Sequence, residues 1–290
     1  MKQSTNYDNF AQKYSESFLK DNTKSITQYF MHVDFDLKEK KLLDLGCGDG
    51  YDLQRFGQLG ALLYGVDASQ EMVALAQKNT SVQAEIKQGY FEEIPFADNF
   101  FDVVVSKWAL QAADNIQSIY QEVHRVLQPR GTFLYLASHP LYQFLEKRKH
   151  PKDYFQKEMV EVKLFAGKII IREPTHTLNE YLSAYFFQHF DLQAYEEGFD
   201  DSVEKIQGDT YPIFFILNSP VVFCHSWRRH DTLRPYSALL SERVKSDAAS
   251  YCNSRPRGDG PRGHLSGSLC ESVPVSPFPE LLNGPHRSGQ

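Results

Sequence analysis

Cysteine is scarce in this chain of 290 residues, and long apolar runs are missing from it. The four cysteines, at positions 47, 224, 252 and 270, have neither metal-site nor disulfide-framework spacing, which predicts free thiols in a reducing compartment. The longest apolar stretch, 212–223, is interrupted by polar residues and proline and is much shorter than the ~20 residues of a membrane-spanning helix. The polar first ten residues show no secretory signal pattern. We therefore expect a cytoplasmic protein that is not embedded in a membrane.

Basic residues are also few before position 218. Residues 1–218 carry a formal net charge of −9 and residues 219–290 carry +3, within a whole-chain charge of −6. An acidic body lacks the basic surface that phosphate contacts require, which argues against a nucleic-acid partner. The hydrophobic content of 41% and charged content of 23% are ordinary for globular chains, so a packed core is expected.

Residues 219–290 differ from the rest in composition. They hold 8 of the 14 prolines and 3 of the 4 cysteines, and eight of their nine basic residues are arginine. Ser, Pro and Gly are abundant there and periodic apolar residues are few, which predicts a largely disordered tail outside a folded domain at 1–218. Three origins of this tail stay open: a natural extension, an alternative final exon, or translation past the true end or in another frame.

Strand-like and helix-like segments alternate between positions 41 and 137. The predicted strands are 41–45, 61–66, 82–87, 101–106 and 132–137. The predicted helices are 51–59, 71–77 with Ser69 as N-cap, and 114–127 with Asp114 as N-cap and an end set by Pro129 and Gly131. Further along the chain, we expect strands at 168–171, 190–195 and 213–217 and a helix at 178–187. This order predicts an α/β fold with a parallel sheet that binds its ligand at the carboxyl ends of the strands.

The loop after the first predicted strand has glycine at alternate positions. It reads Asp44-Leu45-Gly46-Cys47-Gly48-Asp49-Gly50 and leads into a helix, whose N-terminus favours an anionic group. Asp67 ends the second strand, where a carboxylate can accept two hydrogen bonds from a ribose diol. The structural alternatives are a plain tight turn and a helix cap at Asp67, although Ser69 already supplies that cap.

Four motifs follow one another in a recognisable order: LLDLGCGDG, GVDAS, GYFEEIPFADNFFDVVVS and EVHRVLQPRGTFLYLAS. Together they resemble the class I S-adenosylmethionine-dependent methyltransferases, specifically the type 11 small-molecule group. The resemblance implies a Rossmann-like methyltransferase fold, with a mostly parallel seven-stranded sheet and helices on both faces. We expect a cofactor-binding core at 40–140, a substrate region with the last strands at 141–218 and, from the spacing of N-terminal aromatic residues, a helical lid at 1–35. Dinucleotide-binding Rossmann enzymes are the rival, but their GxGxxG pattern requires glycine at position 51, which is Tyr51.

The resemblance implies S-adenosylmethionine as the cofactor and gives each part of it a set of residues. The methionine end is assigned to Asp44, Gly46, Cys47, Gly48 and Gly50, the ribose to Asp67 with Ala68, the adenine to Met72, Tyr90 and Phe91, and the sulfonium region to Ser106. Three positions depart from the family pattern. Tyr90 replaces the usual Asp that recognises the adenine amino group, Gln111 stands where His is frequent, and Arg130 replaces the first glycine of a Pro-Gly-Gly turn.

Methyl transfer needs alignment of the reactants and, for some acceptors, a base. The best base candidates are His139 and His176, which lie in strand-end loops, although a capping or solvated role is the alternative for each. His124 is expected at the surface. Tyr14, Trp108 and Gln111 are the predicted substrate residues, and Tyr7, Phe10, Tyr14 and Phe18 predict an amphipathic helix over the site.

We therefore expect a methyltransferase that acts on an oxygen or nitrogen of a small, partly apolar molecule. No metal is expected to take part, and the protein is expected to be a monomer or homodimer. The alternative is a non-catalytic methyltransferase-like partner or assembly subunit that retains cofactor binding.

Overall fold

A computed structural model describes residues 7–18, 24–80, 83–147, 153–165, 167–199 and 212–221. These residues belong to one unit, Met1–Ser226. The prediction of a disordered tail lies outside the described residues, apart from positions 219–221. Those three positions continue the last strand and its pairing, so the folded part extends past Asn218.

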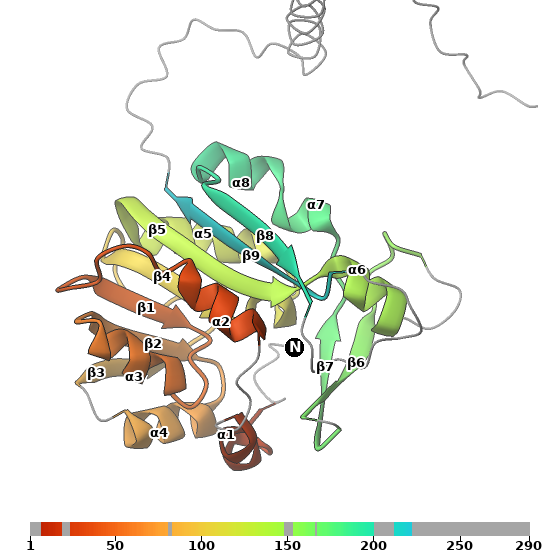
Figure 1. Cartoon of the computed structure of the whole chain (residues 1–290), viewed down its shortest axis with the longest axis horizontal. Coiled ribbons are helices and arrows are strands. Elements are labelled where there is room, and N and C mark those ends of the chain that lie inside the picture. Colours follow the sequence, from red (N-terminus) through yellow and green to blue (C-terminus); the bar gives the residue numbers. More distant parts are fainter. Residues whose placement is uncertain are drawn as a thin grey trace, which may run out of the picture. The chain divides into compact units, whose positions relative to one another are not determined.

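A seven-stranded sheet forms the centre of this unit (Figure 1). Its strand order is β3-β2-β1-β4-β5-β9-β8; the first five strands are parallel, and β9 runs antiparallel to both β5 and β8. This confirms the predicted Rossmann-like fold. The bounds of the strands are β1 Lys41–Leu45, β2 Leu62–Asp67, β3 Ala84–Gln88, β4 Phe101–Lys107, β5 Leu127–Ser138, β6 Met159–Leu164, β7 Ile169–Pro174, β8 Ala194–Gly198 and β9 Phe214–Pro220.

Helices cover both faces of the sheet, as predicted. Their bounds are α1 Ala11–Phe18, α2 Lys24–Met31, α3 Tyr51–Gln58, α4 Gln70–Asn79, α5 Ile116–Val126, α6 Pro140–Tyr142, α7 Leu178–Tyr181 and α8 Ala184–His189, with a 3-10 turn at Leu110–Ala112 and a π-helical turn at Gln143–Lys147. Figure 1 shows α2 and α3 in front of the sheet and α5 behind it.

Alternation along the strands divides the core into two layers. Leu42 belongs to the core layer that contains residues of α2, α3 and α4, whereas its neighbour Leu43 belongs to the layer that contains residues of α5, α7 and α8. The period-2 geometry of a strand sends successive side chains to opposite faces, so the nearly continuous apolar strands fill both layers.

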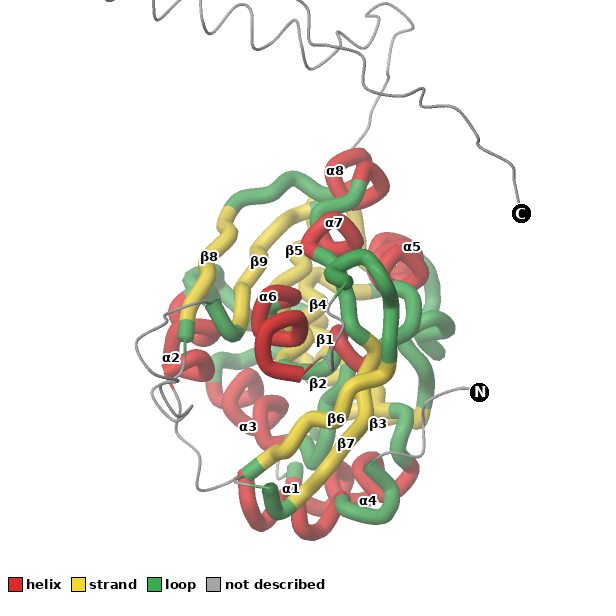
Figure 2. The backbone as a smooth tube through the Cα atoms, turned by 90° about the vertical axis from the view of Figure 1, so that its right-hand side faces the viewer, coloured by secondary structure: helices red, strands yellow, loops and turns green. Residues whose placement is uncertain are grey.

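A two-stranded antiparallel hairpin, β6–β7, is separate from the main sheet. Figure 2, which views the molecule from the carboxyl ends of the parallel strands, shows this hairpin and α6 in front of them, with α1 at one end of the hairpin. The buried face of the hairpin consists of Val160, Val162, Ile169 and Ile171. Aromatic residues of the N-terminal segment, residues 7–18, pack on this face.

Four local predictions were wrong. The N-cap of α5 is Asn115 rather than Asp114, because the Asn115 side chain accepts hydrogen bonds from the amides of Gln117 and Ser118. Strand β5 begins at Leu127 rather than Thr132, since Leu127 already pairs with Phe101; the register then shifts across the segment that holds Arg130, whose φ is +66°, and pairing resumes at Thr132 with Val103. The single helix expected at 178–187 is two helices, α7 and α8. Ser183 between them is the N-cap of α8, and its side chain accepts a hydrogen bond from the amide of Phe186. The strand expected at 190–195 lies later, at β8.

Candidate functional site

A cavity of about 370 Å³ opens at the carboxyl ends of β1, β2 and β4. This is the edge at which the parallel sheet was expected to bind its ligand. Its lining comprises Tyr7, Tyr14, Gly46, Gly48, Asp67, Ala68, Met72, Tyr90, Phe91, Glu92, Lys107, Trp108, Ala109, Ala112, Ala113 and Asp114.

The glycine loop forms one wall of this cavity. Gly46 has a φ of +84°, and a Cβ placed on it would lie 2.5 Å from the Cβ of Ala109, so only glycine lets the β1 and β4 turns meet. Gly48 has a φ of +53°, and nothing lies within 4 Å of a Cβ placed there. Gly48 therefore presents open backbone to the cavity.

Gly50 contacts α4 instead of the cavity. A Cβ on Gly50 would lie 2.7 Å from the hydroxyl of Thr80 and 3.1 Å from the Cα of Ala76. Gly50 is also the N-cap of α3 and has no side chain to cap it. The amide of Tyr51 donates to Asp49, and the first turn of α3 has further backbone N–H groups next to the loop. The third glycine thus serves helix packing.

Asp67 is fixed by backbone donors at the cavity wall. Its Oδ2 accepts a hydrogen bond of 2.9 Å from the amide of Gly48, and its Oδ1 accepts one of 2.9 Å from the amide of Ser69. Burial raises the pKa of the Asp67 carboxyl, although these backbone donors oppose that shift. Ser69 caps α4 through the amide of Met72, as predicted, so the carboxylate of Asp67 is available for another role.

Acidic groups and one ammonium group are buried beside the loop. Lys107 Nζ lies 2.6 Å from Asp52 Oδ2, with the two side chains only 6% and 10% exposed. Asp44, on the neighbouring strand β1, is also buried. Burial and the nearby Asp52 raise the pKa of Asp44, and Lys107 partly offsets this.

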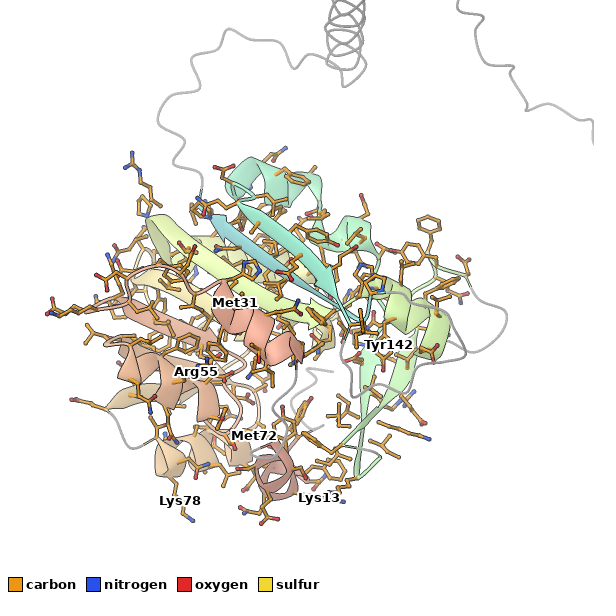
Figure 3. All side chains as sticks on the ribbon, in the orientation of Figure 1. Lys13, Met31, Arg55, Met72, Lys78 and Tyr142 are labelled. Carbon is orange, nitrogen blue, oxygen red and sulfur yellow. The ribbon has the colours of Figure 1, made fainter. Side chains whose placement is uncertain are left out.

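The N-terminal segment closes one side of the cavity. Tyr7 and Tyr14 line it, and their rings meet edge to face with centroids 5.7 Å apart. Ser69 donates a 2.6 Å hydrogen bond to Asp8, and Lys13 donates one to the carbonyl of Lys168 in the hairpin. Figure 3 labels Lys13 on α1 and Met72 on α4, two helices that lie in contact. The segment therefore bridges the α4 edge and the β6–β7 hairpin.

Trp108 lies at the turn after β4 in an uncommon backbone conformation. Its φ is +55°, its amide donates to the carbonyl of Leu136, and its ring meets that of Phe214 edge to face. A bulky residue held at positive φ is a strained feature often associated with function. Trp108 lines the cavity, where the sequence placed it.

Nine of the residues predicted for the site lie together around the cavity, and seven do not line it. The nine are Tyr14, Gly46, Gly48, Asp67, Ala68, Met72, Tyr90, Phe91 and Trp108; the seven are Asp44, Cys47, Gly50, Ser106, Gln111, His139 and His176. Ser106 is buried and donates to the carbonyl of Leu45, so its hydroxyl ties β4 to β1. Cys47 is buried, and burial raises the pKa of its thiol.

Both candidate bases lie outside the lining with their ring nitrogens engaged. His139 Nδ1 accepts from the amide of Leu141 as the cap of α6, and its Nε2 donates to Glu197. His176 Nε2 donates to the carbonyl of Gln111, and its Nδ1 lies 3.5 Å from Glu180. Their catalytic role stays a prediction. The geometry favours the capping alternative for His139, whereas the His176 ring links the Gln111 carbonyl to Glu180. His124 is half-buried against His189, which corrects its expected surface position.

Several lining residues were not predicted for the site from the sequence. They are Glu92, Ala109, Ala112, Ala113 and Asp114. For the three alanines, the signal that could have found them is their position in the segment after β4, since small side chains leave space at a strand end. Along the described parts of the chain, no helix is both long and apolar enough to cross a membrane.

Comparison with known proteins agrees with this geometry. Residues 43–135 match the family model Methyltransf_11, a methyltransferase domain. An uncharacterized methyltransferase (sll0829) from Synechocystis is 39% identical over 102 residues, 34% of this chain and 48% of that protein. The malonyl-[acyl-carrier protein] O-methyltransferase of Hamiltonella defensa is 34% identical over 100 residues, 34% of this chain and 38% of that protein. The chain thus aligns with about half or less of the length of these relatives.

Solved structures show the same fold. An S-adenosylmethionine-dependent methyltransferase from Mesorhizobium loti superposes with a TM-score of 0.55 at 20% identity, covering 68% of this chain and 97% of that one. Another from Clostridium acetobutylicum has a TM-score of 0.54 at 13% identity, covering 74% of this chain and 99% of that one. The class is therefore that of the Rossmann-like methyltransferase folds. Within it, residues 43–135 match the methyltransferase family that the sequence motifs resemble, and that resemblance is confirmed.

Proposed function

We propose that this chain is an S-adenosylmethionine-dependent methyltransferase that acts on an oxygen or nitrogen of a small molecule. The observation that carries the proposal is the position of Asp67, held by the amides of Gly48 and Ser69 at the wall of the cavity. We further propose that it acts in the cytoplasm as a monomer or homodimer, on a metabolite rather than a nucleic acid, given the acidic body.

The residues present fit the cofactor. Open backbone at Gly48 and the first turn of α3 suit the methionine end, and Asp67 with Ala68 suits the ribose hydroxyls. Met72, Tyr90 and Phe91 line the cavity with apolar and aromatic surface that suits the adenine ring. When bound, the cofactor supplies a methyl group activated by a sulfonium. Asp44 is buried behind the loop and does not line the cavity, so its carboxylate would act on the amino group through space.

What the protein adds is mainly alignment and the exclusion of water. Tyr7 and Tyr14 cover the cavity from the N-terminal segment, and Trp108 faces it from the end of β4. These aromatic side chains form the surface against which we place the acceptor. They leave the donor end of the cavity to the glycine loop.

The second candidate is a subunit that binds the cofactor without catalysing transfer. Neither histidine lines the cavity, and Tyr90 stands in place of the usual adenine-binding Asp, which favours this alternative. Activity separates the two, since a subunit would bind ligand but transfer no methyl group to an extract of small metabolites.

Calorimetry with S-adenosylhomocysteine tests the cofactor site. The wild-type chain should bind, Asp67→Ala should lose binding, and Glu71→Ala, which removes an exposed carboxylate from α4, should bind as the wild type does. Binding by the Asp67 variant with wild-type affinity would contradict the proposed site.

A further inference from the structure

The cavity lining is rich in carboxylates. Asp67, Glu92 and Asp114 contribute acidic side chains, and among the described lining residues Lys107 is the one with a permanent positive charge. That charge is already matched by Asp52, whose two oxygens lie 2.6 and 2.8 Å from Nζ. The side chains that line the cavity therefore carry a net negative formal charge.

Aromatic rings line the cavity beside these carboxylates. The rings of Tyr7 and Tyr14 meet edge to face. The ring of Tyr14 also meets that of Phe165 edge to face, with the two centroids 5.3 Å apart. Burial raises the pKa of both phenols, and neighbouring carboxylates act in the same direction. For Tyr7 these carboxylates are Glu173 and Asp67. For Tyr14 they are Asp49, Asp52 and Asp67. The two phenols consequently stay protonated and neutral. Aromatic faces in a field of carboxylates attract cations.

The charge that moves during methyl transfer distinguishes the possible acceptors. When a neutral amine attacks, its lone pair forms the C–N bond, the C–S bond breaks with its electron pair going to sulfur, and the positive charge passes from sulfur to nitrogen. The cavity then holds one positive charge before and after the reaction. Carboxylates and aromatic faces stabilise that charge at either position.

Oxygen acceptors suit this lining less well. A carboxylate or phenolate would have to enter as an anion among Asp67, Glu92 and Asp114, where like charges repel. A neutral hydroxyl group would have to give its proton to one of these weakly basic carboxylates, since the lining, as far as the structure describes it, contains no histidine.

We infer that the acceptor is a small secondary or tertiary amine that reacts as the free base and binds against Tyr7, Tyr14 and Trp108. This inference rests on the proposed methyltransferase function. A tertiary amine yields a quaternary ammonium product, and a secondary amine yields a protonated tertiary amine that loses its proton to water.

Transfer of a carbon-13-labelled methyl group from S-adenosylmethionine into a small-metabolite extract tests the inference. The carbon shift of the transferred methyl tells whether it is bonded to nitrogen, oxygen or carbon, and we expect nitrogen. A methyl on oxygen or carbon would overturn the amine inference and leave methyl transfer standing. No transferred methyl, with S-adenosylhomocysteine still bound, would overturn catalysis and the inference together.

A second measurement tests the aromatic subsite directly. The probes are benzyltrimethylammonium and its uncharged isostere neopentylbenzene, titrated in the presence of S-adenosylhomocysteine. The wild type should bind the cation about tenfold or more tightly than the isostere. Tyr14→Leu should lower that ratio about tenfold, whereas Tyr14→Phe, which keeps the ring face, should retain it. Equal affinity for both probes in the wild type would refute the cation subsite, and the ratio of the two affinities is insensitive to a loss of folded protein.

Discussion

Lys107 and Asp52 form an ion pair of 2.6 Å at the cavity, with both side chains nearly removed from solvent. Lys107 ends β4, whereas Asp52 lies in the first turn of α3, so the pair joins the fourth strand to the helix that follows the glycine loop. Phe30 of α2 lies beside it, with its ring centroid 5.7 Å from Lys107 Nζ. Strand β4 and helices α3 and α2 therefore meet at this one ion pair.

Lys107→Met should destabilise the fold strongly. It leaves Asp52 buried beside Asp44 without its partner, a change that costs about 3–5 kcal/mol for a buried pair. Urea unfolding should show this loss, and the double variant Asp52→Asn with Lys107→Met should recover most of it. Lys40→Met removes one partner of the more exposed pair with Asp102 and should cost less than about 1 kcal/mol. Equal losses for the two lysines would show that burial does not set the strength of the Lys107 pair.

Asp44→Asn should stabilise the chain, and more so at higher pH. Burial and Asp52 raise the pKa of Asp44 in the folded state above its ordinary value of about 3.9. The stability linked to this group is complete below the ordinary pKa and is lost as pH rises through the raised one. The advantage of the variant in the free energy of unfolding should therefore grow from pH 4 to pH 8, while its affinity for S-adenosylhomocysteine falls. An advantage that stays constant with pH would argue against a raised pKa.

Gly46→Ala and Gly48→Ala should fail in different ways. At position 46 the new Cβ meets Ala109 at 2.5 Å, and the clash adds to the backbone strain, so unfolding should become easier by about 3 kcal/mol or more. At position 48 no atom obstructs the Cβ, and only about 1–2 kcal/mol of backbone strain is expected. Gly48→Ala should nevertheless weaken S-adenosylhomocysteine binding in calorimetry, because the methyl group points toward open space at the cavity wall. Wild-type affinity in this variant would mean that the ligand does not approach Gly48.

The part of the site proposed to bind the methyl donor could be predicted from short stretches of the sequence. The continuous apolar run 101–106 predicts a strand covered on both faces, and Ser69 predicts the start of α4; the structure confirms both. Gly46 and Gly48 lie at the cavity because the turns that lead from a parallel strand to the following helix all lie at the carboxyl edge of the sheet. These features depend on neighbours within a few residues.

The part of the site proposed to bind the methyl acceptor, and its surroundings, depend on contacts between residues that are distant in sequence. His139 is fixed by Glu197, 58 residues away, and His176 by the carbonyl of Gln111, 65 residues away, so a location at strand ends did not reveal that their nitrogens are engaged. The strand β6 went unpredicted because its burial depends on β7 and on the N-terminal aromatic residues that pack on it. Lys107 shows the same limitation, since its partner Asp52 lies 55 residues away.

His139→Asn should reduce the loss of stability on acidification. Burial lowers the pKa of His139, outweighing the opposite effect of Glu197. The stability linked to a lowered histidine is complete above the ordinary pKa of about 6.5 and is lost as pH falls through the folded value. Asn can still cap α6 but does not titrate, so the fall in unfolding free energy from pH 7 to pH 5 should be smaller than in the wild type. Burial and His189 lower the pKa of His124 too, and adding His124→Asn should flatten the profile further. If the unfolding free energy of the variant falls as steeply with acidification as that of the wild type, the pKa of His139 is not lowered in the folded protein.

Asp8→Ala should release the N-terminal segment without weakening α4. The Asp8 carboxylate accepts the 2.6 Å hydrogen bond from Ser69, whose oxygen also accepts the amide of Met72 as the cap of α4. Removing Asp8 breaks only the first of these bonds, so hydrogen exchange should rise over residues 11–18 and stay unchanged over 70–79. Ser69→Ala removes both bonds and should also cost about 1 kcal/mol of stability through the lost cap. Because Tyr14 belongs to the released helix and lines the cavity, both variants should bind benzyltrimethylammonium more weakly. If Asp8→Ala leaves exchange over 11–18 unchanged, the hairpin contacts alone hold α1 in place.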